Sequence, residues 1–253
     1  KLNRMTADIY LNDLTNQKTR KKPVDIKSRI EFSDNDFGWF AVADKFQISR
    51  QNGFSPESRI EVQINENKIS GTSTLDSNIS FFDLKDLSSI SALIDNNFLS
   101  DFLKFQPTGK LKDTKINISN IKELDNRFDI STDFDDLSLL LSIKKNQESN
   151  KFNIDGVSGK FFMNQTGGRL DLSSQNSSVT SDYYFDGNLS LNRADGAIIW
   201  RRNEQGIIIL SDNIELQNPF LDIATSFEIS WLEEQRTPYV DIEGFWNIHD
   251  VAQ

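Results

Sequence analysis

The feature that most constrains this chain is an alternation of apolar and polar side chains, repeated along most of its length. In one stretch the apolar positions are Ile208, Leu210, Ile214 and Leu216, at every second residue, and only Asp212 interrupts them. A period of two is typical of a β-strand with one apolar and one polar face. The pattern therefore predicts a mainly β chain whose strands each keep one face in water.

The same alternation recurs in strand-like segments before and after this stretch. Aromatic residues take part in it, and we expect the apolar side chains to form one continuous wall. The members of this predicted wall are Ile60, Val62, Ile64, Ile116, Ile118, Leu170, Leu172, Trp200, Ile208, Leu210, Ile214, Leu216, Phe227, Ile229, Trp231, Val240, Ile242, Trp246 and Ile248.

Short turn signals separate the strand-like segments. Residues that favour turns stand at 51–53, 65–67, 145–150, 166–168, 203–206 and 233–238. Connections this short join antiparallel neighbours, so the strands are expected to form a meander. The sequence Ser-Asp-Asn at 211–213 is a weaker signal of the same kind, and it indicates a bulge or a break in the strand.

The segment 83–106 departs from the alternation. Its apolar residues follow a spacing of three to four, and Pro107 ends the pattern. We expect two short helices near 84–105, which cap one part of the sheet. The predicted organisation is a single domain, since no long linker is visible, with strands over 1–82, short helices over 83–106 and strands over 107–253.

Composition limits what such a sheet can enclose. Apolar residues make up 37% of the 253 residues, and the mean hydropathy of −0.49 is low for a closed two-layer core. A sheet with one wet face needs fewer apolar side chains. The net charge of −10 would repel a phosphate backbone, so no nucleic-acid partner is expected. The absence of cysteine excludes disulfides and thiolate chemistry.

Few residues look fit for catalysis. His249 is the only histidine, and the pattern places it on the polar side of the last strand. Asp34 and Asp36 resemble the opening of a calcium loop, but the glycine and closing glutamate of that loop are not in place. Acidic residues at 133–136 do not point to a particular catalytic pair. We therefore expect no enzyme activity, no catalytic residue, no metal and no cofactor.

The predicted apolar wall has more than one interpretation. It is either the core of a β-sandwich, as in a binding or adhesion module, or the open groove of a single curved sheet that binds an apolar ligand. Asp212 favours the open sheet slightly, because an unpaired carboxylate is costly in a dry core. A third interpretation is a carbohydrate-active enzyme, in which Tyr184 and Phe245 on the wet side would stack on sugars.

Three segments together resemble a known family. The first is FLSDFLKFQPTGKLKDTKINIS (98–119), a helix and then a Leu-x-Pro-x-Gly-x-Leu-x-Asp pattern with Phe105 in the leucine place. The others are IDGVSGKFFMNQTGGRLDLSSQNSSV (154–179) and the hairpin DGAIIWRRNEQGIIILSDNIELQN (195–218), which PYVDIEGFWNIHD follows. In this order they resemble the YhdP-type members of the bacterial AsmA-like, TamB-related family.

This resemblance implies a bridge-like lipid-transfer protein built on a long, curved and twisted antiparallel β-sheet with an open apolar groove. Such proteins are anchored in the inner membrane of Gram-negative bacteria, extend through the periplasm and are implicated in moving phospholipid toward the outer membrane. For this chain the resemblance implies an internal, periplasmic segment, with the anchor before it and a part that reaches the outer membrane after it. The implied partner is phospholipid, and no catalytic residue is implied.

Overall fold

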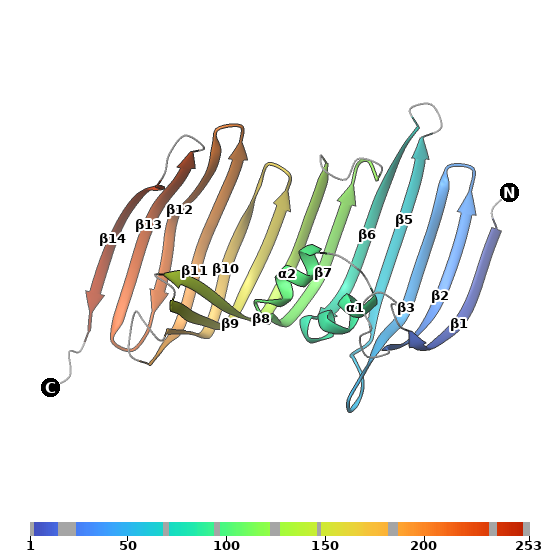
Figure 1. The fold of residues 1–253 in the computed structure, drawn as a ribbon, viewed down its shortest axis with the longest axis horizontal. Helices are drawn as coiled ribbons and strands as arrows, with labels where there is room; N and C mark the ends of the chain where they lie inside the picture. Colours follow the sequence, from blue (N-terminus) through green and yellow to red (C-terminus); the bar gives the residue numbers. More distant parts are fainter. Residues whose placement is uncertain are drawn as a thin grey trace. The chain divides into compact units, whose positions relative to one another are not determined.

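The structure of the chain, a computed structural model, is mainly β (Figure 1). Its strands follow one another with a short helical segment in the first half of the chain. The residues that the structure describes are 3–14, 24–67, 71–93, 97–121, 127–145, 148–181, 187–232 and 237–249.

The helical segment falls where the three-to-four spacing predicts it, which confirms the insertion near 84–105. It consists of η1 (Leu84–Asp86), α1 (Leu87–Leu93) and α2 (Asn97–Leu103). The strands before it are β1 (Asn3–Leu14), β2 (Val24–Asn35), β3 (Gly38–Arg50), β4 (Gly53–Phe54), β5 (Ser58–Asn67) and β6 (Thr72–Asp83). The strands after it are β7 (Thr108–Ile118), β8 (Phe128–Lys145), β9 (Glu148–Asn164), β10 (Gly167–Ser181), β11 (Asn188–Asn203), β12 (Gly206–Gln217), β13 (Leu221–Leu232) and β14 (Tyr239–Ile248).

The strands pair in the order in which they occur in the chain. The order is β1-β2-β3-β5-β6-β7-β8-β9-β10-β11-β12-β13-β14, and β4 pairs with β3 alone. This is a single antiparallel sheet that is not closed, so the predicted fold class is confirmed, and the sheet is consistent with a β-groove. Within the described ranges no second sheet faces it, as the core of a β-sandwich would require, so the sandwich interpretation is wrong for these residues.

The chain divides into two compact units. Unit 1 spans Lys1–Thr132 and unit 2 spans Asp133–Gln253. The two units are described separately below, and the expectation of one domain stays a prediction.

In unit 1 the register of the strands places the predicted wall residues on one face. Residues that pair directly across antiparallel strands point to the same side of a sheet. This face is mainly apolar, and we call it the unit 1 apolar face. Its rows across the strands are Trp39–Ile64–Leu75–Ile118, Met5–Phe32–Ala41–Val62–Ser77–Ile116 and Ala7–Ile30–Ala43–Ile60–Ile79–Thr114.

The opposite face of unit 1 carries charged side chains that pair across strands. The pairs include Arg4–Glu31 at 2.7 Å, Arg29–Asp8 at 2.9 Å and Arg59–Asp44 at 2.6 Å. The hydrogen bond from Arg29, with its positive charge, lowers the pKa of Asp8 below its usual value. Exposed pairs of this kind stabilise a fold only slightly, but they identify this face as the one in water.

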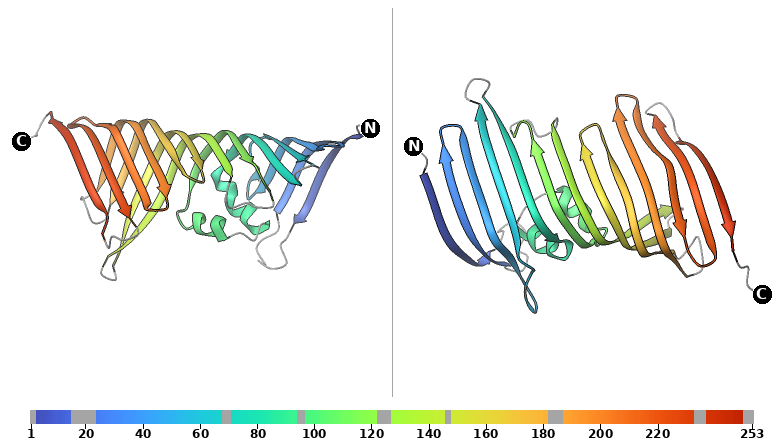
Figure 2. Two further views of the ribbon diagram at one scale, coloured as in Figure 1. Left: turned by 90° about the horizontal axis from the view of Figure 1, so that it is seen from above. Right: turned by 180° about the vertical axis from the view of Figure 1, so that it is seen from behind.

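The helices of unit 1 lie on one side of its strands (Figure 2). Ile90 of α1 packs against a small cluster made by Val24 and Ile48, with Ile26 and Phe46 beside them. Because Ile26 and Ile48 are register partners in β2 and β3, the covered side is the unit 1 apolar face. The helical insertion therefore caps one part of the sheet, as its sequence predicts.

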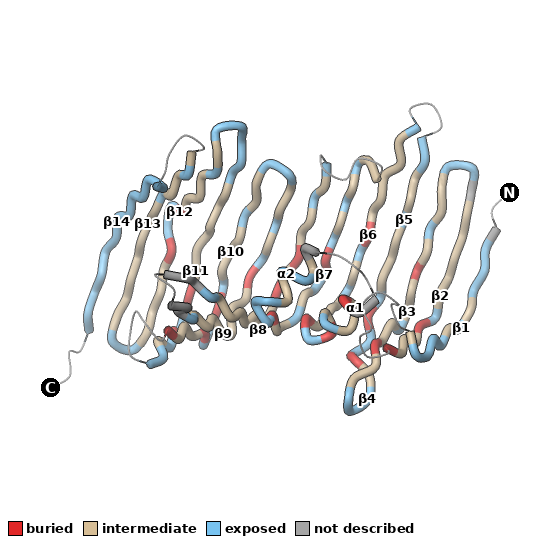
Figure 3. Tube along the Cα trace, in the orientation of Figure 1, coloured by how far each residue is buried: buried red, intermediate tan, exposed pale blue. Residues whose placement is uncertain are grey.

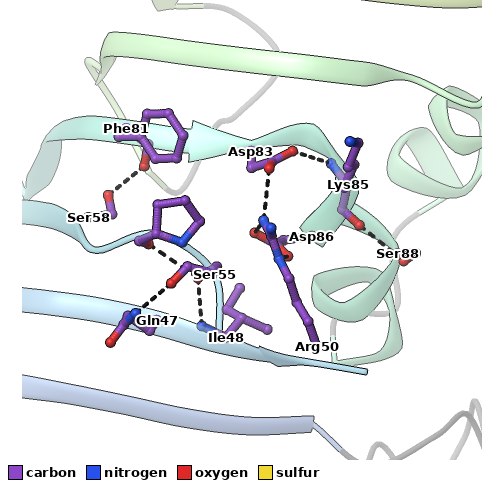
Figure 4. A network of polar contacts seen from close by, with 11 residues as sticks. Gln47, Ile48, Arg50, Ser55, Ser58, Phe81, Asp83, Lys85, Asp86 and Ser88 are labelled. Atoms are coloured by element: carbon purple, nitrogen blue, oxygen red, sulfur yellow. Dashed lines mark hydrogen bonds and ion pairs between the residues drawn. The ribbon is translucent and has the colours of Figure 1, made fainter. Parts of the chain in front are cut away.

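A partly buried ion-pair cluster fixes the start of this helical segment to the sheet (Figure 4). Arg50, at the end of β3, donates from Nε and Nη2 to the two carboxylate oxygens of Asp86 at 2.7 Å each. It also donates to Asp83 at 2.9 Å. The second oxygen of Asp83 accepts the Lys85 amide at 3.0 Å and so caps the first turn of η1. These contacts define the Arg50 clamp.

In unit 2 a β-bulge in β12 interrupts the simple alternation of apolar and polar residues. Ser211 pairs with Phe227 and Ile214 pairs with Thr225, so three steps along β12 match two along β13. The extra residue lies within Asp212–Asn213, which confirms the predicted bulge. One extra residue shifts the alternation by one position. Odd-numbered residues of β12 before the bulge therefore share a face with even-numbered residues after it.

The predicted face of Ile208 and Leu210 is wrong for this reason. Both lie on the side opposite Ile214 and Leu216, where they pair with Ser230 and Glu228. Their neighbours Ile207 and Ile209 take the apolar side instead.

Candidate functional site

A broad apolar surface covers one face of β10 to β14, and we call it the unit 2 apolar face. The registers align its residues in rows across the five strands. Apart from Ile208 and Leu210, every predicted wall residue of unit 2 lies on it. Its apolar members are Leu170, Leu172, Ile198, Trp200, Ile207, Ile209, Ile214, Leu216, Leu221, Ile223, Phe227, Ile229, Trp231, Val240, Ile242, Trp246 and Ile248.

Much of this face is open to water toward the β14 edge. Trp231 is 59% exposed, Ile242 65%, Trp246 66% and Ile248 62%. Figure 3 shows β14 in the exposed colour along its length. Contiguous exposed apolar surface with a polar face behind it marks a binding surface more often than an ordinary protein exterior.

The other face of the same strands is polar. Arg169 and Asp171 form an ion pair at 2.7 Å, and Arg193 pairs with Asp195. The hydrogen bond and charge of Asp171 raise the pKa of Arg169. Phe245 is an apolar exception on β14, since it lies on this polar face and is 70% exposed, and Tyr239 on the same face is 55% exposed.

Asp212 belongs with the polar face and does not interrupt the apolar one. It is exposed, and its charge also acts on Arg169, a residue of the polar face. Asn213 beside it donates to Glu215 at 2.9 Å, and Glu215 lies on the polar face as well. The bulge therefore turns both polar residues toward water and keeps the apolar face free of charge at this point.

Trp200 lies flat on the strand next to it because that strand has a glycine there. A Cβ added to Gly168, its register partner, would be 2.1 Å from Cζ2 of Trp200. The ring of Phe161 lies 5.7 Å from the Trp200 ring, centroid to centroid. The Thr-Gly-Gly sequence that indicates a hairpin turn thus also makes room for an aromatic side chain on the apolar face.

Small hydroxyl side chains are buried in the bulged part of unit 2. Ser174 is 1% exposed, accepts the Ser158 amide at 2.9 Å and donates to the Ser158 carbonyl at 3.1 Å. Ser211 is 2% exposed, and within the described residues its hydroxyl has no hydrogen-bond partner. The Ser174 hydroxyl supplies hydrogen bonds to the backbone of Ser158, where bulges interrupt the strand pairing. The Ser211 hydroxyl makes no such bond among the described residues.

Residues considered for chemistry do not assemble into a reactive site. His249 contacts Asp222 at 2.5 Å on the surface, and Asp133 lies 3.7 Å from Lys160. Among the residues that the structure describes, no group of three His, Cys, Asp or Glu could hold a metal ion. Tyr184, proposed for sugar stacking, lies outside the described residues. The absence of catalysis stays a prediction.

Sequence reasoning missed several members of the unit 2 apolar face. Ile207 and Ile209 are hidden by the reversed alternation before the bulge, and Ile198 lies in the run of apolar residues at 197–200 that has no clear period. The signal that could have found Ile207 and Ile209 is the Asp-Asn pair itself, because an inserted residue at that point moves the apolar face by one position.

The fold and the unit 2 apolar face define the class of protein, which is an open antiparallel sheet with one apolar and one charged face. The chain belongs to the YhdP family, since the family model described as "YhdP protein" matches residues 1–253. This membership suggests a lipid-transfer role of the AsmA-like kind and a place in the bacterial envelope. The searches of curated proteins and of solved structures returned no significant match. None of the helices in the described ranges has the length and apolar character to cross a bilayer.

Proposed function

We propose that this chain is a segment of a lipid-transfer protein that holds phospholipid acyl chains on its apolar faces. The observation that carries the proposal is the exposed apolar face of β13 and β14, with a charged face directly behind it. An acyl chain on that face would leave water, at about 0.8 kcal/mol for each buried CH₂ group. A chain of many such groups can bind by this gain alone.

The mechanism we propose is passive. Rows of similar branched and aromatic side chains offer nearly equal contacts from strand to strand, so an acyl chain can move between them without a large barrier. The polar headgroup stays in water at the edge of the face. No single side chain is then essential, and the segment needs no catalytic residue, metal or cofactor.

We further propose that the segment lies in the periplasm of a Gram-negative bacterium. It would belong to a protein anchored in the inner membrane and would carry phospholipid toward the outer membrane. Family membership supports this proposal. The charged face supports it too, because an acidic surface keeps a long open sheet soluble between two membranes.

A matched pair of variants on β14 tests the binding surface. Ile242 and Phe245 are both large, apolar and exposed, at 65% and 70%, but they lie on opposite faces. Because both are exposed, replacing either with Asp should change stability little. Lipid that co-purifies with the chain, measured by native mass spectrometry and by solvent extraction, should fall in Ile242→Asp and stay at the wild-type amount in Phe245→Asp. Equal lipid in the two variants, or no lipid on the wild-type chain, would contradict the proposal.

A further inference from the structure

Arg202 is a charged residue at the end of the unit 2 apolar face. In β11 it follows Trp200 by two residues, and it pairs with Ile207 of β12, which pairs in turn with Trp231 of β13. These pairs place Arg202 on the apolar side of the sheet. Among the register positions described for this face in β10 to β14, Arg202 carries the one charged side chain.

The side chain of Arg202 is available to a ligand. It is exposed, and within the described residues its guanidinium makes no hydrogen bond or ion pair. Arg193 and Arg169 on the polar face each have a carboxylate partner. Arg201 has no ion pair within the described residues either, so what distinguishes Arg202 is a free guanidinium on the apolar side of the sheet.

We propose that Arg202 binds the phosphate of a phospholipid whose acyl chains lie on the unit 2 apolar face. This inference rests on the proposed function and adds a headgroup site to it. A guanidinium presents a planar set of donors that fits two phosphate oxygens. Trp231, 59% exposed in the same row, suits the boundary between headgroup and acyl chain because its ring is apolar and its N–H is polar.

The dimensions of the face agree with this placement. From Trp231 to Phe227 is four residues along β13, or about 13 Å at about 3.3 Å per residue, and the apolar face continues beyond Phe227 to Ile223 and Leu221. One leaflet of a bilayer has an apolar depth of about 15 Å, half of the ~30 Å hydrocarbon core. An acyl chain whose phosphate is at Arg202 would therefore extend along the strands over Ile229 and end near Phe227, and the face is long enough to hold it.

The neighbouring residue supplies a matched control. Arg201 is exposed like Arg202, but it pairs with Ile208 and so lies on the polar face. Arg201→Gln and Arg202→Gln remove the same charge at adjacent positions. Two soluble probes separate the headgroup from the chains: dihexanoylphosphatidylglycerol, and dihexanoylglycerol, which has the same acyl chains and no phosphate.

Titration calorimetry of the whole chain with both probes tests the site. For the phospholipid, Arg202→Gln should weaken binding about fivefold, since the contact is charged but exposed. Arg201→Gln should leave binding within twofold of wild type, and Arg202→Lys should lie between. For dihexanoylglycerol, wild type and all variants should bind equally.

Three results would overturn the headgroup site. They are equal weakening in Arg201→Gln and Arg202→Gln, no weakening in Arg202→Gln, or a parallel loss of dihexanoylglycerol binding in that variant. In each of these the wild-type chain still binds dihexanoylglycerol, so the proposed function survives. If the wild-type chain binds neither probe, the proposed function fails along with the site.

Discussion

The Arg50 clamp gives a sharp prediction about what holds the helices on unit 1. The side chains of Asp86 and Asp83 are only 5% and 13% exposed, and that of Arg50 is 31% exposed. Arg50→Ala would leave two nearly buried carboxylates without their cation. Breaking a fully buried pair in this way costs about 3–5 kcal/mol. With Arg50 partly in water, we expect unit 1 to lose about 2–3 kcal/mol of unfolding free energy.

Arg59→Ala is the matched control for Arg50→Ala. Arg59 also contacts two carboxylates, those of Asp44 and Glu61, but its side chain is 48% exposed. Its loss should cost much less than the loss of Arg50, because exposed pairs contribute little. Urea unfolding of the variants gives both values. Hydrogen exchange should show faster exchange of the amides of η1 and α1 only in Arg50→Ala.

A second substitution tests the cause of the loss. The double variant Arg50→Ala, Asp86→Ala removes the carboxylate of Asp86 together with its cation. One carboxylate fewer is then buried without a partner, so part of the lost stability should return. The reasoning is refuted if Arg50→Ala costs no more than Arg59→Ala. It is refuted as well if the amides of α1 keep their protection when Arg50 is removed.

Further predictions concern unit 2 and its edge. Gly168→Ala should cost about 1–3 kcal/mol in urea unfolding, because the new methyl group overlaps an aromatic ring and a backbone carbonyl; a cost under about 0.5 kcal/mol would contradict the packing. In the same assay Ser174→Ala should cost about 1–2 kcal/mol, whereas Ser211→Ala should be neutral or stabilising, because the Ser211 hydroxyl is buried with no hydrogen-bond partner among the described residues. The reverse order would contradict the hydrogen bonds described. The open edge at β14 should make the chain associate with increasing concentration in analytical ultracentrifugation, and Val240→Lys should reduce this; equal association would place the contact elsewhere.

Much of the fold was predictable because it depends on short-range patterns. The alternation of apolar and polar residues and the turn preferences each depend on a few neighbouring residues. Strands such as β5, β13 and β14 therefore follow directly from the sequence. β6 is less visible because its apolar face includes Ser73 and Ser77, and small polar residues on the inner face hide the period. The helical insertion was visible because its spacing differs from that of every strand around it.

The candidate site was predictable only in part, because a face depends on register. Ile208 and Leu210 show the limit: one extra residue at Asp212–Asn213 moves them to the polar side. Arg202 shows a second limit of prediction from sequence, since nothing in the local sequence distinguishes its role from that of Arg201. Only the pairing of β11 with β12 shows that one arginine faces the apolar side and the other does not.

The central claim is that lipid lies on one face of the sheet and not on the other. A phospholipid that carries a photoreactive diazirine in its acyl chain can be bound to the chain, activated by light and mapped by peptide mass spectrometry. The account predicts adducts on β14 at Ile242 and Trp246, and none at Asp241 or Glu243, which alternate with them on the polar face. Adducts spread equally over both sets, or confined to Asp241 and Glu243, would contradict it.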